Sequence, residues 1–171
     1  MKKLFLASVL SSLMFAAGPF GLNIGKSNVE DVKKLDCKYR ESYLIDGVYP
    51  NDGRFLSFEN CHLMDNLKNA EFAFDDDGIL VYARLIFDDK NSYNELKTSL
   101  NKKYKITKSV EPFVGDRLSE YALKGEKIKL NSPHMSFSVY LEYEQNDFSK
   151  RVKKAQQKAK EQKQNATTNM L

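Results

Sequence analysis

The chain has 171 residues with 9 Tyr and 11 Phe, a composition that excludes a largely disordered protein and a length that suits one domain with its own core. Its net charge of +4 is unevenly placed, because residues 150–171 hold seven Lys or Arg and one Glu, whereas residues 18–149 hold 18 basic and 22 acidic residues. An acidic body argues against nucleic-acid binding, which needs positive charge on the folded face.

Residues 1–17 have the pattern of a secretory signal peptide. A Met-Lys-Lys start precedes an apolar run that ends at Ala17, and such a start followed by about 7–15 apolar residues is typical of these leaders. A membrane-spanning helix would need about 20 apolar residues. We expect cleavage after Ala17, with cleavage after Gly18 as the alternative. No cysteine ends the run, so we expect a periplasmic or secreted protein without a lipid anchor or a transmembrane segment.

The predicted globular domain spans residues 18–149 and begins with a helix. Ser27 and Glu30 form a capping box, in which each side chain can satisfy a backbone donor at a helix start. Apolar residues at helical spacing then predict a helix over residues 28–38. Two strands are expected after it, at residues 41–46 and 53–58, separated by a segment rich in turn-forming residues.

A β-hairpin is the clearest local pattern of the chain. Apolar-rich runs at residues 70–75 and 79–87 flank an Asp-Gly pair, and Gly78 tolerates the positive φ that such a turn requires. A second capping box starts at Ser92 and is followed by an apolar stripe, which predicts a helix over residues 92–104.

Three more strands are predicted at residues 118–123, 126–130 and 135–143. The last alternates strictly, with one face made of Met135, Phe137, Val139, Leu141 and Tyr143. Such alternation is typical of an antiparallel sheet that is buried on one side. The order of elements predicts an α+β fold, with a single antiparallel, meander-like sheet covered on one face by two to three helices.

Two cysteines, Cys37 and Cys61, fall in the predicted mature protein. In an oxidising compartment two thiols of one small domain usually pair, so we expect a disulfide. Two separate buried thiols are the alternative.

The C-terminal segment, residues 150–171, is predicted to be a basic tail that begins as a helix and frays beyond Gln162. Its solvated charges need no further explanation. The functional alternative is contact with an anionic envelope surface, made by Lys150, Arg151, Lys153 and Lys154.

No pattern of catalytic, cofactor-binding or metal-binding residues is convincing. Residues 21–27 lack the four-residue spacing of a phosphate loop. Residues 75–78 cannot be an EF-hand, because the first and twelfth positions of that loop would be Ala73 and Arg84. His62 and His134 are the only histidines, too few for a zinc site. A hydrolase would need polar groups to converge around one of them. We therefore predict no enzyme and no cofactor.

The absence of a chemical motif favours a non-catalytic protein-binding module, either of the inhibitor or immunity type or an envelope accessory protein. Tyr82 and Tyr140 are expected to be exposed on the wet strand face, and aromatic side chains are enriched at protein contacts. The alternative is a protein that binds a small apolar ligand or an envelope surface. A cavity between the sheet and its helices would favour that alternative.

The start of the domain resembles the start of many small exported bacterial proteins, and it is similar to the helix-entry motif of the SmpA/OmlA-type outer-membrane assembly lipoproteins. The resemblance is carried by Phe20, Gly21, Leu22, Gly25, Ser27, Val32 and Leu35. It implies a small helix-and-sheet module that binds other envelope proteins, and it assigns no site residue.

Overall fold

The structure is a computed structural model that describes residues 18–43, 54–59 and 61–169. The predicted signal peptide, residues 1–17, lies outside the described residues. After a 3-10 turn, η1 (Pro19–Gly21), the described chain forms α1 (Val29–Lys33), β1 (Tyr39–Tyr43), β2 (Arg54–Glu59), β3 (Leu67–Phe74), β4 (Leu80–Phe87), α2 (Ser92–Asn101), β5 (Ile106–Val110), β6 (Arg117–Leu123), β7 (Glu126–Ser132), β8 (Val139–Gln145) and α3 (Phe148–Asn169).

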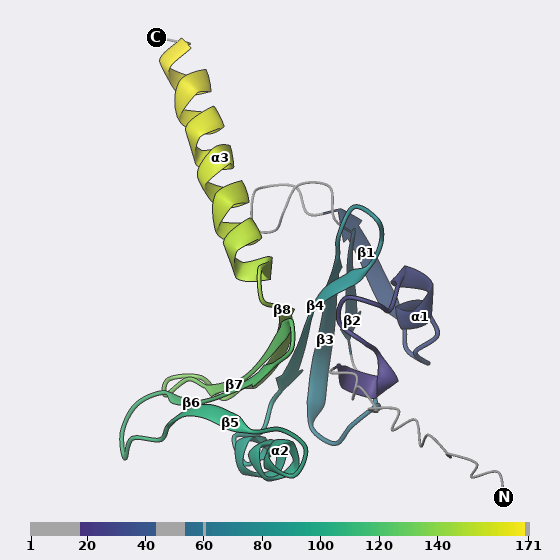
Figure 1. Cartoon of the computed structure of the whole chain (residues 1–171), viewed down its shortest axis with the longest axis vertical. Coiled ribbons are helices and arrows are strands. Elements are labelled where there is room, and N and C mark those ends of the chain that lie inside the picture. The colour runs from purple at the N-terminus through teal and green to yellow at the C-terminus, as the bar shows by residue number, and fades with distance from the viewer. Residues whose placement is uncertain (1–17, 44–53, 60, 170–171) are drawn as a thin grey trace, which may run out of the picture.

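All eight strands join one antiparallel sheet in the order β1-β2-β3-β4-β8-β7-β6-β5 (Figure 1). The predicted α+β class with a single antiparallel sheet is therefore confirmed. The sheet is not one continuous meander, however. Two four-stranded meanders, β1–β4 and β5–β8, meet where β8 pairs with β4. Each meander follows a helix, so the order of one helix and four strands occurs twice along the chain.

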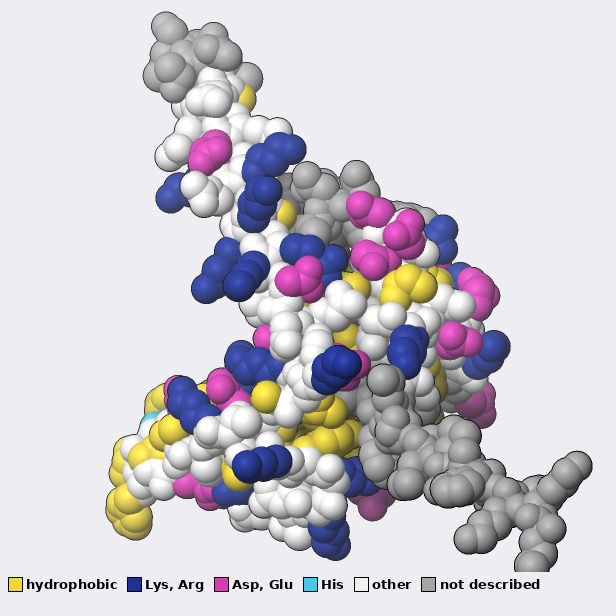
Figure 2. Space-filling model, in the orientation of Figure 1, with side chains coloured by type: hydrophobic (Ala, Val, Ile, Leu, Met, Phe, Trp, Pro, Cys, Tyr) yellow, Lys and Arg dark blue, Asp and Glu magenta, His cyan; other side chains and the backbone are white. Residues whose placement is uncertain are grey.

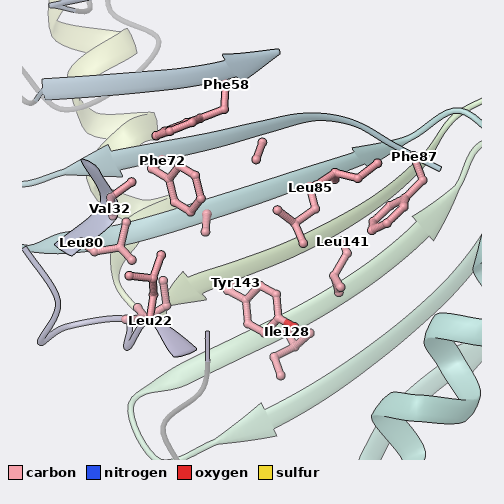
Figure 3. Close-up of a cluster of buried hydrophobic side chains, with 14 of the residues drawn as sticks. Leu22, Val32, Phe58, Phe72, Leu80, Leu85, Phe87, Ile128, Leu141 and Tyr143 are labelled. Carbon is pink, nitrogen blue, oxygen red and sulfur yellow. The ribbon is translucent and has the colours of Figure 1, made fainter. Parts of the chain in front are cut away.

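Alternation along the strands places most apolar side chains on one face of the sheet, which we call the core face. It carries the larger buried cluster, and Figure 3 labels Phe58, Phe72, Leu85, Phe87, Leu141 and Tyr143 among its members. Helices α1 and α2 both contribute to this cluster. Helix α3 does not join them, because Phe148 at its start packs with Tyr82 in a second cluster on the opposite face. The predicted covering of one face by two to three helices is therefore not confirmed, and α3 packs against the other face.

Neither predicted capping box forms as expected: the first is shifted by one residue, and the second, predicted at Ser92, is absent. In α1 the N-cap is Asn28, whose side chain accepts from the backbone N–H groups of Glu30 and Asp31, and Asp31 accepts from Asn28 in return. The helix ends at Lys33 rather than at residue 38, since the chain turns toward β1. In α2 the N-cap is Asn91 without a side-chain cap, and Ser92 is already helical.

Most strand boundaries differ by a few residues from the sequence-based expectation, and one strand was missed. Strand β3 begins at Leu67, and β5 was not predicted, because its residues do not alternate between buried and exposed. Strand β8 begins at Val139 instead of residue 135. The strand predicted at residues 41–46 corresponds to β1, and its last residues lie outside the described part of the chain.

Cys37 and Cys61 lie at disulfide distance, as predicted, with Cα atoms 5.6 Å apart. Cys37 follows α1 and Cys61 follows β2, so the pair connects the first helix to the loop that leads into β3. Cys61 is 2% exposed.

The sequence predicted a helix that frays beyond Gln162. In the structure, α3 instead continues to Asn169. It rises from the end of β8 and projects away from the sheet (Figure 1). Among the described residues, no helix is both long and apolar enough to cross a membrane.

Candidate functional site

Four large apolar side chains project from two neighbouring loops at one end of the molecule. Phe113 is fully exposed, Met135 and Phe137 are 90% and 84% exposed, and Val114 is 65% exposed. Phe113 and Val114 belong to the β5–β6 loop, and Met135 and Phe137 to the β7–β8 loop; we call the four residues the apolar tip. Apolar side chains gather at this end of the molecule in Figure 2. Clustered exposed apolar residues, unlike scattered ones, mark an interaction site.

Strand pairing and hydrogen bonds between side chains and the backbone hold the two loops together. Strands β6 and β7 pair up to the register Arg117↔Ser132, directly before the loops diverge. Beyond it, the His134 N–H donates to Asp116 Oδ1 at 2.7 Å, and Lys90 Nζ donates to the His134 carbonyl at 3.0 Å. Lys90 Nζ also lies 5.9 Å from the centre of the Phe137 ring. The tip is therefore attached to the β4–α2 loop as well as to the sheet.

Glu111 anchors the base of the β5–β6 loop to α2. Its carboxylate accepts from Lys97 of α2, from Ser109 Oγ at 3.1 Å and from Arg117 Nη2 at 3.2 Å. Arg117 in turn lies over the ring of the buried Tyr93, 4.0 Å from its centre. This network fixes the direction in which the loop leaves the sheet.

We expect the anchor at Glu111 to persist to pH values below the ordinary carboxyl range. The hydrogen bond from Lys97, followed by those from Arg117 and Ser109, holds the pKa of Glu111 below its ordinary value of 4.5. A lowered pKa in the folded state means that the stabilisation is complete above pH 4.5 and is lost as the pH falls through the lowered pKa. Carbon-detected NMR titration should show this midpoint, and Lys97→Met should move it upward. An unchanged midpoint in that variant would contradict the anchor.

The apolar tip was not predicted from the sequence. Met135 and Phe137 were assigned to the buried face of a strand, and this assignment is wrong. The Ser136 N–H donates to the Pro133 carbonyl and the Ser138 N–H to Ser136 Oγ, which holds the segment in turns until β8 begins. The two prolines of these loops could have indicated the exposed segments. Pro112 and Pro133 lie just before the exposed apolar residues, and proline disfavours regular strands.

Tyr82 and Tyr140 lie on the face of the sheet opposite to the core face, and Tyr140, as the second residue of β8, is near the loop that carries Met135 and Phe137. Tyr82 is 5% exposed, contrary to the expectation of a solvent-facing ring, because α3 covers it. Its ring stacks on Phe148 with centres 4.8 Å apart, and its hydroxyl donates to Glu142 at 2.7 Å. Tyr140 is half-buried and faces Ile86 and Asn131 on the neighbouring strands.

Charged residues of alternating sign cross this face of the sheet in a single row, and we call it the charged face. The cross-strand register places them side by side from β5 to β1, in the order Lys108, Glu120, Lys129, Glu142, Arg84, Glu71 and Arg40, with the uncharged Ser57 between the last two. Two of the contacts are ion pairs, Arg84–Glu71 at 2.5 Å and Lys129–Glu142 at 3.8 Å. Much of the charge on this face is thus neutralised within the sheet.

The four basic residues predicted to contact an anionic surface lie in the first turns of α3. Lys150, Lys153 and Lys154 are exposed, whereas Arg151 is half-buried and donates to Gln145 Oε1 at 2.8 Å. Since β8 runs from the apolar tip to α3, these residues lie at the far end of that strand. Lys153 lines a shallow hollow of about 330 Å³ above Tyr82.

The two histidines do not form a common site. His62 and His134 are both exposed, and His134 contributes only backbone groups to the tip. In the described ranges, no group of three or more His, Cys, Asp or Glu is placed to hold a metal ion.

Comparisons with known proteins add little to this geometry. No family model and no curated protein matches the chain. It is similar to a solved structure described as a GTP binding regulator from Thermotoga maritima, at 11% identity over 70% of this chain and 75% of that chain, with a TM-score of 0.32. A similarity at this level supports no inference about function.

Proposed function

We propose that this chain is an exported, non-catalytic protein-binding module whose apolar tip inserts into a concave apolar site of a partner protein. The observation that carries the proposal is the tip itself, with four large apolar side chains exposed by 65% or more on two joined loops. A convex apolar projection requires a concave partner surface. An inhibitor or immunity-type protein that fills the cleft of its target has this shape, and the acidic body suits a basic target.

The attachment of the tip supports a binding role rather than accidental exposure. Ordering loops on association costs free energy, so a projection that is already ordered binds more tightly. Both loops are restricted before any contact is made, because the His134 N–H donates to Asp116, Lys90 donates to the His134 carbonyl, and Lys97 donates to Glu111. Gly115, with φ of 134°, adds a turn that a side chain would strain.

The charged face is less suited to the same role. The centre of a protein interface is depleted of charged residues, and burying ion pairs such as Arg84–Glu71 costs desolvation. We therefore favour the two loops of the apolar tip over the charged face as the contact surface.

Export is supported by the leader pattern of residues 1–17 and by the disulfide distance between Cys37 and Cys61. The small helix-and-sheet architecture is compatible with the envelope role that the resemblance of residues 20–35 implied. Export and the envelope role both remain part of the proposal.

The test is quantitative binding to a partner captured from periplasmic extract or culture medium. We expect Phe113→Ser to weaken that complex by at least about 30-fold, the effect of removing an aromatic hot spot. Thermal unfolding should be unchanged, because the fully exposed ring contributes little to stability. Mass spectrometry of the exported protein should find Gly18 as its first residue.

Tyr140→Ser is the matched control, since it removes an aromatic side chain from the charged face. If Tyr140→Ser abolishes binding while Phe113→Ser retains it, the contact lies on the sheet and the assignment to the tip is wrong. A protein that retains Met1 in the cytosol would overturn the export part of the proposal.

A further inference from the structure

A second site lies on the core face, at the junction of the two meanders. A half-open cleft of about 200 Å³ separates α2 from the segment around Pro19. Its floor is formed by Leu85 of β4 with Leu141 and Tyr143 of β8, which Figure 3 labels on neighbouring strands. The helices that contribute to the core thus leave a gap above the central strand pair.

The lining of this cleft is apolar except at one end of α2. Leu96 and Leu100 form one wall, and Met64, 41% exposed, lies at the opening. Lys103 is the only charged residue of the lining, which contains no acidic side chain. Within the described parts of the chain, Lys103 forms no ion pair. The site therefore combines an apolar floor with an unpaired cation.

We propose that this cleft binds a free fatty carboxylate of about six to ten carbons, with its chain on Leu85 and Leu141 and its head group at Lys103. The size follows from volume, since an apolar cavity of about 150 Å³ accommodates benzene and 200 Å³ accommodates a somewhat longer chain. The head group follows from charge, because a lone ammonium at the edge of an apolar cleft is complementary to an anion. The inference does not depend on the apolar tip.

Two tyrosines, Tyr104 and Tyr143, are also among the residues that line the cleft. Burial raises the pKa of Tyr143, and burial together with the nearby Glu126 carboxylate raises the pKa of Tyr104. Both phenols line the cleft and stay protonated at neutral pH. A protonated hydroxyl can donate to a carboxylate, whereas a phenolate would repel it.

Calorimetric titration of the purified protein with hexanoate, octanoate and decanoate tests the proposal. Each added methylene should tighten binding about fourfold until the chain outgrows the cleft. Lys103→Met should weaken octanoate binding about tenfold and leave octanol binding unchanged. Lys102→Met is the matched control, because Lys102 is the preceding residue and does not line the cleft.

A variant that fills the cleft gives an independent test. Ser99 lines the cleft from the exposed surface of α2, so Ser99→Phe should occupy the space without disturbing the core. We expect it to weaken octanoate binding at least about tenfold, whereas Phe113→Ser at the tip should have no effect. The proposal is overturned if no chain length binds at millimolar concentration, if Lys102→Met and Lys103→Met behave alike, or if a peptide ending in Leu binds more tightly than octanoate.

Discussion

Loss of the Cys37–Cys61 link should lower the free energy of unfolding by about 3 kcal/mol. The two cysteines are 24 residues apart in sequence, and a cross-link that closes a loop of this length removes substantial entropy from the unfolded chain. Cys61 is 2% exposed, so its replacement by Ala also leaves a small unfilled space in the core. For a domain of this size the change corresponds to a decrease in Tm of about 10 °C.

Thermal unfolding of the Cys37→Ala/Cys61→Ala protein, followed by circular dichroism, measures this effect. The matched control is the wild-type protein in excess reductant, which loses the cross-link but keeps both thiol side chains. The two samples should unfold at similar temperatures, both well below the oxidised protein. If reductant leaves Tm unchanged, the pair contributes no stability, and the argument for an oxidising compartment loses its physical basis.

Local features of the fold could be predicted because their causes are local. The turn between β3 and β4 is stabilised by Asp75, whose Oδ1 accepts from the Ile79 N–H at 2.8 Å, and by Gly78 at a φ of 74°. Both residues lie inside the predicted hairpin.

The order of the strands could not be predicted, because it depends on contacts between distant segments. Leu85 and Leu141 face each other across β4 and β8, yet either would serve equally well beside another alternating strand. The row of alternating charges on the charged face could not be predicted either, for the same reason. Glu142 lies next to both Arg84 and Lys129 only once the strand order is known.

The candidate sites were hidden for related reasons. Apolar and polar residues alternate from Met135 to Tyr143, but β8 begins only at Val139. The alternation therefore predicted a buried strand face for residues that lie in an exposed loop. The cleft depends on the separation of α2 from the segment around Pro19, which no local pattern determines. The alternation along β4 predicted a solvent-facing Tyr82, but Phe148 at the start of α3 stacks on its ring, and Tyr82 is 5% exposed.

Leu141→Ala should lower the free energy of unfolding by about 2–5 kcal/mol, because it removes a buried side chain from the strand pair that joins the two meanders. Leu141 is 3% exposed and faces Leu85, which is 1% exposed, across the β4–β8 pairing. Urea unfolding measures the change, and Leu123→Ala, a half-buried position at the β6–β7 turn, is the control with a smaller cost.

If the junction couples both meanders, the variant should unfold in one transition at a lower midpoint, with the slope unchanged. Two separate transitions would mean that β1–β4 and β5–β8 are independent units, and that the sheet is continuous in geometry without being cooperative in unfolding.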